Sequence, residues 1–142
     1  MRKYKNYQEF YSLNQARFDA VQGMAALLKS PKDMSATGFV LAEAENLEHL
    51  FLNGANSVTE LMFGLSASVL GAETNMNNVE GLLYGQKSGN ATDKRNAVAC
   101  DPQYVLASEA YQELKDLKDY LEQKRDDFMA NHYFYKQFRS QK

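Results

Sequence analysis

Apolar side chains recur along most of the chain at intervals of three and four residues, the spacing of one face of an α-helix. With about 100° of rotation per residue, a first apolar stripe contains Phe10, Leu13, Phe18, Val21, Met24 and Leu28. No two apolar runs are joined by a hairpin turn signal, and no internal repeat is visible. The pattern therefore predicts an all-α fold.

Capping residues and glycines set the expected helix boundaries. Asn6 followed by Glu9, and Ser57 followed by Glu60, have the spacing of a capping box, so a helix should begin at each place. Glycines behind the apolar runs favour helix ends. The expected helices cover residues 6–29, 36–53 (ended by Gly54), 57–71 and about 77–84 (followed by Gly85).

Residues 85–100 form the longest stretch without large apolar side chains, and we expect a mobile loop there. Pro102 suits the first turn of a helix, so the last helix should start at that point and reach Phe134 or beyond. The prediction is a single domain over residues 1–142, a compact bundle of four to five helices with a long C-terminal helix.

The last helix carries a coiled-coil-like seam. One line contains Leu106, Ala110, Leu114, Leu117, Leu121 and Phe128. Alternate steps of three and four residues from Leu114 reach Tyr135 and Phe138, with Lys124 and Asn131 as polar interruptions. The partner of this seam is either another helix of the bundle or a second copy of the chain.

Two charged residues fall within apolar stripes. Arg17 lies in the first stripe and Glu43 in the second. Because a lone buried charge is costly, we predict a buried structural pair between them if the first two helices form an antiparallel hairpin. The alternative is that each side chain reaches the solvent at the bundle edge.

The third expected helix is apolar on two sides. Phe63 and Leu70 project from the side opposite Leu61 and Leu65. Either this helix is central in the bundle, or Phe63 and Leu70 dock on another chain.

Charge is distributed unevenly. The net charge is −2, but residues 33–86 contain no Lys or Arg and hold seven acidic residues. Glu45 and Glu48 could form an acidic face for a partner with a basic surface; alternatively, acidic helices pack beside basic ones. A basic nucleic-acid footprint is missing, so direct DNA binding is not expected.

Aromatic residues gather at both ends of the chain. Those near the C-terminus include Tyr133, Phe134 and Phe138, interleaved with basic residues. Aromatic side chains at a terminus need a surface to cover them. They either close the bundle or form an anchor patch for a partner or a second copy.

Arg125 and His132 stand seven residues apart on the apolar side of the last helix, and "HYF" begins at His132. The segment resembles the Arg-x(4–6)-His motif of HEPN domains, which are all-helical RNases active as dimers. By this resemblance, Arg125 would stabilise the scissile phosphate. His132 would transfer the proton during attack by the 2′-hydroxyl of RNA, without a metal.

The remaining chemistry is sparse. Cys100 is the single cysteine, which favours a reducing compartment. The longest apolar run is interrupted by Glu60 and is shorter than the roughly 20 residues that cross a bilayer, so no membrane association is expected. No metal-ligand cluster and no phosphate-binding loop appear, so neither a metal nor a cofactor is expected.

The leading hypothesis is a small non-enzymatic helical protein that binds another protein. We expect a cytoplasmic regulator or inhibitor of the kind that phages and plasmids encode, forming a homo-oligomer. The alternative is a HEPN-like, metal-independent RNase, a toxin or defence component that uses Arg125 and His132.

Overall fold

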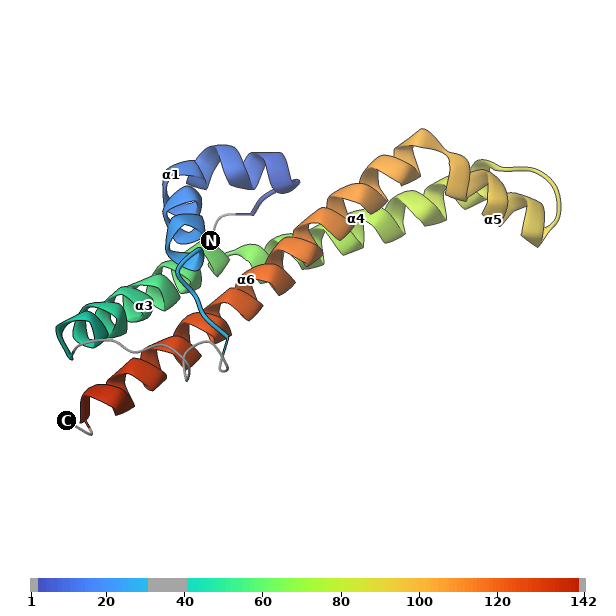
Figure 1. The fold of residues 1–142 in the computed structure, drawn as a ribbon. Coiled ribbons are helices and arrows are strands. Elements are labelled where there is room, and N and C mark those ends of the chain that lie inside the picture. The colour runs from blue at the N-terminus through green and yellow to red at the C-terminus, as the bar shows by residue number, and fades with distance from the viewer. Residues whose placement is uncertain (1–2, 31–40, 141–142) are drawn as a thin grey trace. The chain divides into compact units, whose positions relative to one another are not determined.

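The computed structural model describes residues 3–30 and 41–140, and none of these lies in a strand. They form the helices α1 (Tyr7–Ala25), α3 (Leu41–Met62), α4 (Leu65–Gln86), α5 (Ala91–Cys100) and α6 (Pro102–Ser140) (Figure 1). The predicted all-α bundle with a long C-terminal helix is confirmed.

Two compact units share these helices. Unit 1 consists of Met1–Leu13 and Phe63–Lys118, and unit 2 of Asn14–Met62 and Asp119–Lys142. Helix α1 is interrupted at Asn14, whose φ of −127° and ψ of 16° are not helical. The first half of α1 belongs to unit 1 and the second half to unit 2. Helix α6 also contributes to both units, to unit 1 up to Lys118 and to unit 2 from Asp119. Whether the chain is a single domain stays a prediction.

Unit 2 is built on α3 and the second half of α6, which lie side by side (Figure 1). The ring of Phe51 packs against Phe128 at 6.1 Å and against Tyr135 at 5.8 Å between ring centroids. All three side chains are fully buried. Burial of such a ring stabilises the fold by roughly 1.5–3 kcal/mol. The other buried apolar residues of this unit are Phe18, Val21, Ala44, Ala55, Val58, Leu61 and Leu121.

The predicted apolar seam of α6 is buried from Leu114 to Tyr135, but Leu106 at its start is exposed and Phe138 at its end is half-buried. Its buried residues from Leu114 onward are Leu114, Leu117, Leu121, Phe128, Asn131 and Tyr135. Lys124 is half-buried, with its ammonium 3.7 Å from the Asp127 carboxylate and 5.5 Å from the centre of the Tyr120 ring. Its polar end is therefore satisfied on the helix's own surface while its stem covers part of the seam.

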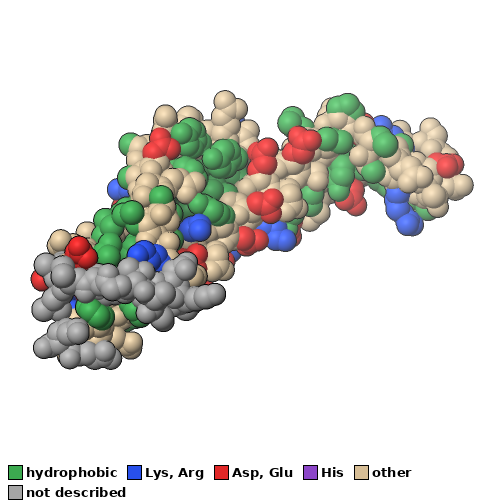
Figure 2. Space-filling model, in the orientation of Figure 1, with side chains coloured by type: hydrophobic (Ala, Val, Ile, Leu, Met, Phe, Trp, Pro, Cys, Tyr) green, Lys and Arg blue, Asp and Glu red, His purple; other side chains and the backbone are tan. Residues whose placement is uncertain are grey.

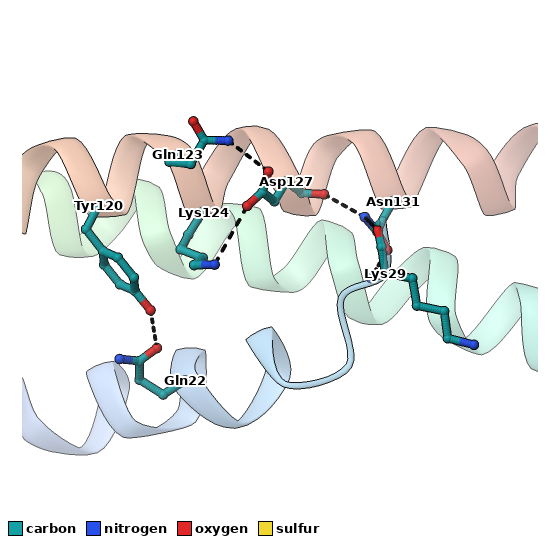
Figure 3. A network of polar contacts seen from close by, with 7 residues as sticks. All are labelled: Gln22, Lys29, Tyr120, Gln123, Lys124, Asp127 and Asn131. Atoms are coloured by element: carbon teal, nitrogen blue, oxygen red, sulfur yellow. Dashed lines mark hydrogen bonds and ion pairs between the residues drawn. The ribbon is translucent and has the colours of Figure 1, made fainter. Parts of the chain in front are cut away.

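Asn131 occupies the other polar position of the seam because it holds the backbone of Lys29 (Figure 3). Its Oδ1 accepts from the Lys29 N–H at 3.1 Å, and its Nδ2 donates to the Lys29 carbonyl at 3.2 Å. The same Nδ2 also donates to the Asp127 carbonyl at 3.0 Å. A buried carboxamide with these bonds avoids the cost of an unsatisfied polar group. Nearby, the Tyr120 hydroxyl donates to Gln22 of α1.

Unit 1 has a smaller interior. The segment before α1 is fixed to α4 by a hydrogen bond of 2.8 Å from the Tyr4 N–H to the Ser68 hydroxyl, which itself donates to the Gly64 carbonyl. The Tyr4 ring meets Phe10 edge-on at 5.2 Å. The buried apolar residues of the unit are Tyr4, Phe10, Leu65, Leu83, Val98, Ala107, Leu114 and Leu117.

The predicted start of the first helix is confirmed, because Asn6 Oδ1 accepts from the Glu9 N–H at 2.9 Å. The boundaries of the next helices are wrong. Helix α3 continues through Gly54 and Ser57, and α4 continues through Gly71. The break comes instead at Gly64, whose φ of 86° is left-handed and favours glycine. The predicted start of the second helix lies outside the described residues.

Gly54 serves packing rather than termination. A Cβ built there would lie 2.8 Å from the Phe128 ring, so only glycine lets that ring approach α3 so closely. The sequence pattern of a glycine behind an apolar run was therefore misread as a helix end.

The predicted loop over residues 85–100 is also wrong for most of its length, because α5 covers Ala91–Cys100. Asn90 caps this helix by accepting from the Asp93 N–H at 2.9 Å. The sequence did not indicate α5 because the segment is mostly polar and buries only Val98. The connection that remains is short and contains Gly89, with a φ of 104°.

Gly54→Ala should destabilise the protein by about 1 kcal/mol. Alanine gains up to about 1 kcal/mol of helix propensity, but crowding of a buried ring costs typically 1–3 kcal/mol. The matched control is Gly81→Ala in α4, where a Cβ meets nothing within 4 Å. That substitution should raise stability. Urea unfolding followed by circular dichroism measures both, and equal effects of the two substitutions would contradict the packing role of Gly54.

Candidate functional site

The predicted buried pair of Arg17 and Glu43 is wrong. Both residues are exposed. Arg17 instead pairs with Glu60 at 2.7 Å, with the two side chains 51% and 59% exposed. The helix-wheel argument took α1 as one continuous helix, whereas the break at Asn14 changes which side of it Arg17 occupies. An ion pair this exposed contributes little to stability.

Glu48 was predicted to lie on an acidic binding face, but it is buried and connects α3 to the end of α6. Its carboxylate accepts two hydrogen bonds from the Arg139 guanidinium, at 2.6 Å and 3.1 Å. Its backbone carbonyl lies 2.8 Å from His132 Nδ1. Since a carbonyl can only accept, Nδ1 carries the proton of this bond. Glu45 is exposed, so it alone remains available for the predicted face.

The Glu48–Arg139 pair shifts the titration of both groups. The bidentate hydrogen bonds from Arg139 hold the pKa of the Glu48 carboxyl below its usual value, although burial of the carboxyl acts in the opposite direction. The same bonds raise the pKa of Arg139. The bidentate ion pair therefore holds α3 and the end of α6 together, which is a structural role.

Arg125 and His132 take up separate positions in unit 2. Arg125 is half-buried and its guanidinium lies 3.8 Å from the Met62 sulfur at the end of α3. His132 is 6% exposed and bonds to the middle of α3 at Glu48. Within the described residues these two side chains share no partner, so the spacing in the sequence does not produce a joint site within this chain.

The C-terminal aromatic residues differ in exposure. Tyr133 is 52% exposed, while Phe134 and Phe138 are half-buried. The Phe134 ring meets Tyr135 edge-on at 5.3 Å, so it belongs largely to the packing of unit 2. Of the predicted anchor patch, Tyr133 is the residue that offers most of its ring to solvent.

Exposed large apolar side chains are concentrated in unit 1. Phe63 and Leu70, which were expected on a second apolar side, are 66% and 65% exposed. The exposed large apolar residues of unit 1 are Tyr7, Leu13, Phe63, Leu70, Leu82, Val105 and Leu106, and those described in unit 2 are Leu27 and Tyr133. Figure 2 shows hydrophobic side chains at the surface near α5 and the start of α6, and also over α1.

Helix α4 has an outward side without any charge. Its inner seam runs from Leu65 to Leu83, and its charged residues, Glu73 and Glu80, lie about 100° around the helix from the centre of the opposite side. We call that opposite side the α4 outward face; it consists of Ala67, Leu70, Thr74, Asn77, Asn78, Gly81 and Gly85. Apart from the half-buried Ala67, all of these residues are exposed.

A second surface feature of unit 1 is a groove that the sequence did not indicate. Two hollows of about 660 Å³ and 490 Å³ share Lys5, Asn75, Ala107 and Ala110, so they adjoin. We call them together the unit 1 groove. Tyr7 and Tyr11, whose rings stack at 6.1 Å, line it together with neighbouring residues of the N-terminal segment and of α1, and residues of α4 and α6 line the rest.

No helix in the described ranges combines the length and apolar character needed to cross a membrane. Within residues 3–30 and 41–140, no cluster of three or more His, Cys, Asp or Glu side chains is arranged to hold a metal. No protein-family profile matches the chain, and no curated protein or solved structure matches it significantly.

Arg139→Gln should lower the thermal stability most at neutral pH. Glu48 has a lowered pKa in the folded state, so it stabilises the fold above the ordinary value of 4.5 and loses this effect as the pH falls below it. Without Arg139 the buried carboxylate has lost both its bonds at pH 7, but it is protonated in acid. The difference in melting temperature from the parent protein should therefore narrow between pH 7 and pH 3.

Arg17→Gln is the matched control, because it removes the exposed pair with Glu60. Its melting temperature should stay close to that of the parent protein across the same pH range. A constant difference for Arg139→Gln at all pH values would show that the ion pair is not what holds these helices.

Proposed function

We propose that this chain is a non-enzymatic protein that acts by binding another protein, as a regulator or inhibitor, and that the α4 outward face is its binding surface. The observation that supports this proposal is that the α4 outward face is exposed to solvent, has no charged residue and contains the exposed Leu70. Cores of protein interfaces are depleted of charge in the same way.

The shape of the α4 outward face supports docking of a helix. A Cβ at Gly81 or Gly85 would meet nothing within 4 Å, so the backbone is open to close approach there. Leu70, one of the most exposed apolar side chains described, offers an anchor beside these small residues. The fitting partner segment is an amphipathic helix that brings its apolar side against α4.

An RNase function receives less support. Its proposed base, His132, is 6% exposed and bonded to the Glu48 carbonyl. A group that transfers protons to a substrate must come within hydrogen-bond reach of it. Burial of this ring in unit 2 therefore favours a structural role, together with Glu48 and Arg139.

Leu70→Lys and Gly81→Lys should each weaken partner binding at least about tenfold, because they place charge and bulk on the α4 outward face. Glu80→Lys is the matched control: it changes the charge of the same helix away from that face, and should alter the affinity by less than about threefold. The partner is first isolated with the tagged chain from an extract of the source organism, and affinities are then measured by calorimetry with both proteins purified.

Circular dichroism verifies that each variant keeps its helical content. If Leu70→Lys and Gly81→Lys bind as tightly as the parent chain, the α4 outward face is not the binding surface. Cleavage of RNA by the purified chain that Arg125→Ala and His132→Ala both abolish would overturn the non-enzymatic assignment.

A further inference from the structure

The pairing of α4 with α6 in unit 1 leaves its own seam incompletely covered. No residue of α4 between Ser68 and Leu83 is buried. The seam residues of that stretch, Val69, Ala72, Met76 and Val79, are all half-buried. A helix pair that buries its apolar stripe only in part gains from contact with further helices.

The unit 1 groove lies over this incompletely covered region. Val79 of α4 and Ala107 and Ala110 of α6 contribute to its floor. Beside these small residues stands Leu106, which lines the same groove and is 70% exposed. The groove thus combines a hollow with a protruding apolar side chain.

Charges of both signs also line the groove. Lys5 comes from the segment before α1, whereas Glu109 and Glu113 come from α6; Lys3 and Glu9 line the adjoining hollow. Lys5, Glu109 and Glu113 are exposed, and no described residue forms an ion pair with any of them. An occupant that matches this groove must offer a carboxylate to Lys5 and a cation to the two glutamates.

We propose that the occupant of the unit 1 groove is the unit 1 groove of a second copy of this chain, related by a two-fold axis. In such a dimer every contact occurs twice with exchanged roles. Leu106 of each copy enters the hollow of the other. Lys5 of each copy pairs with Glu109 and Glu113 of the other, and the two α4–α6 pairs together form a four-helix bundle.

This inference goes beyond the proposed function and does not depend on it. The unit 1 groove and the α4 outward face have no residue in common. The dimer would leave the α4 outward face of each copy available for another protein. The two proposals can therefore fail separately.

Native mass spectrometry and sedimentation equilibrium of the full chain test the dimer. The expected mass is twice 16.1 kDa. Leu106→Glu should raise the dimer dissociation constant at least about tenfold, because it places a charge in the apolar centre of both halves of the interface. Leu27→Glu, an exposed leucine of unit 2, is the matched control and should leave the dimer intact.

A charge exchange gives the sharper test. Lys5→Glu alone should weaken the dimer, and so should Glu109→Lys combined with Glu113→Lys, since each places like charges opposite one another. An equimolar mixture of these two variant proteins should regain the parental affinity as a heterodimer. Loss of folding cannot imitate this recovery, because an unfolded chain would not be restored by mixing.

Three results would overturn the proposal. One is a chain that stays at 16.1 kDa up to about 100 µM, above the range of specific dimers. Another is a dimer that Leu106→Glu leaves unchanged, and the third is the lack of recovery in the mixture. None of these results bears on partner binding at the α4 outward face, which is tested separately with Leu70→Lys.

Discussion

The apolar seam of α6 is the constraint on which the remaining structure depends. Its residues recur in steps of three and four from Leu114 to Tyr135, which places them in a line along one side of the helix. The same helix supplies residues to both compact units, up to Lys118 in unit 1 and from Asp119 in unit 2. Each unit therefore depends on this line for the burial that offsets the conformational entropy of its other helices.

The polar members of that seam determine how closely other segments are held. Asn131 is a polar residue at a seam position, and it forms hydrogen bonds with both the N–H and the carbonyl of Lys29. These bonds fix the segment that follows α1. Near the end of the same helix, Arg139 reaches the buried carboxylate of Glu48. These hydrogen bonds are directional, and the close approach of the Phe128 ring to Gly54 of α3 restricts the packing in a similar way. Ring packing and directional polar contacts together thus place the segments of unit 2.

Sequence periodicity predicted the fold class, the long last helix and the cap at Asn6, because each follows from local spacing. It did not predict that α3 runs through Gly54, since the reason lies in the ring of Phe128, more than seventy residues away. Polar composition concealed α5, although Asn90 followed by Asp93 is a recognisable cap. Phe63 and Leu70 are exposed, but the break at Gly64 separates them, so they do not form the second side of one helix that the sequence predicted. The burial of Glu48 could not be read there, because its partner Arg139 is distant along the chain.

The two units differ in the exposure of their large apolar side chains, and both surfaces that we propose lie in unit 1 for this reason. In unit 2 the charged Glu48 and the polar Asn131 are buried with their hydrogen bonds made internally. In unit 1 the exposed Leu70, Leu82 and Leu106 remain in water. Apolar area that stays in water represents free energy that association can still release, at roughly 25 cal/mol per Å² before the entropic cost of binding is subtracted. The surfaces proposed above, the α4 outward face and the unit 1 groove, would cover Leu70 and Leu106.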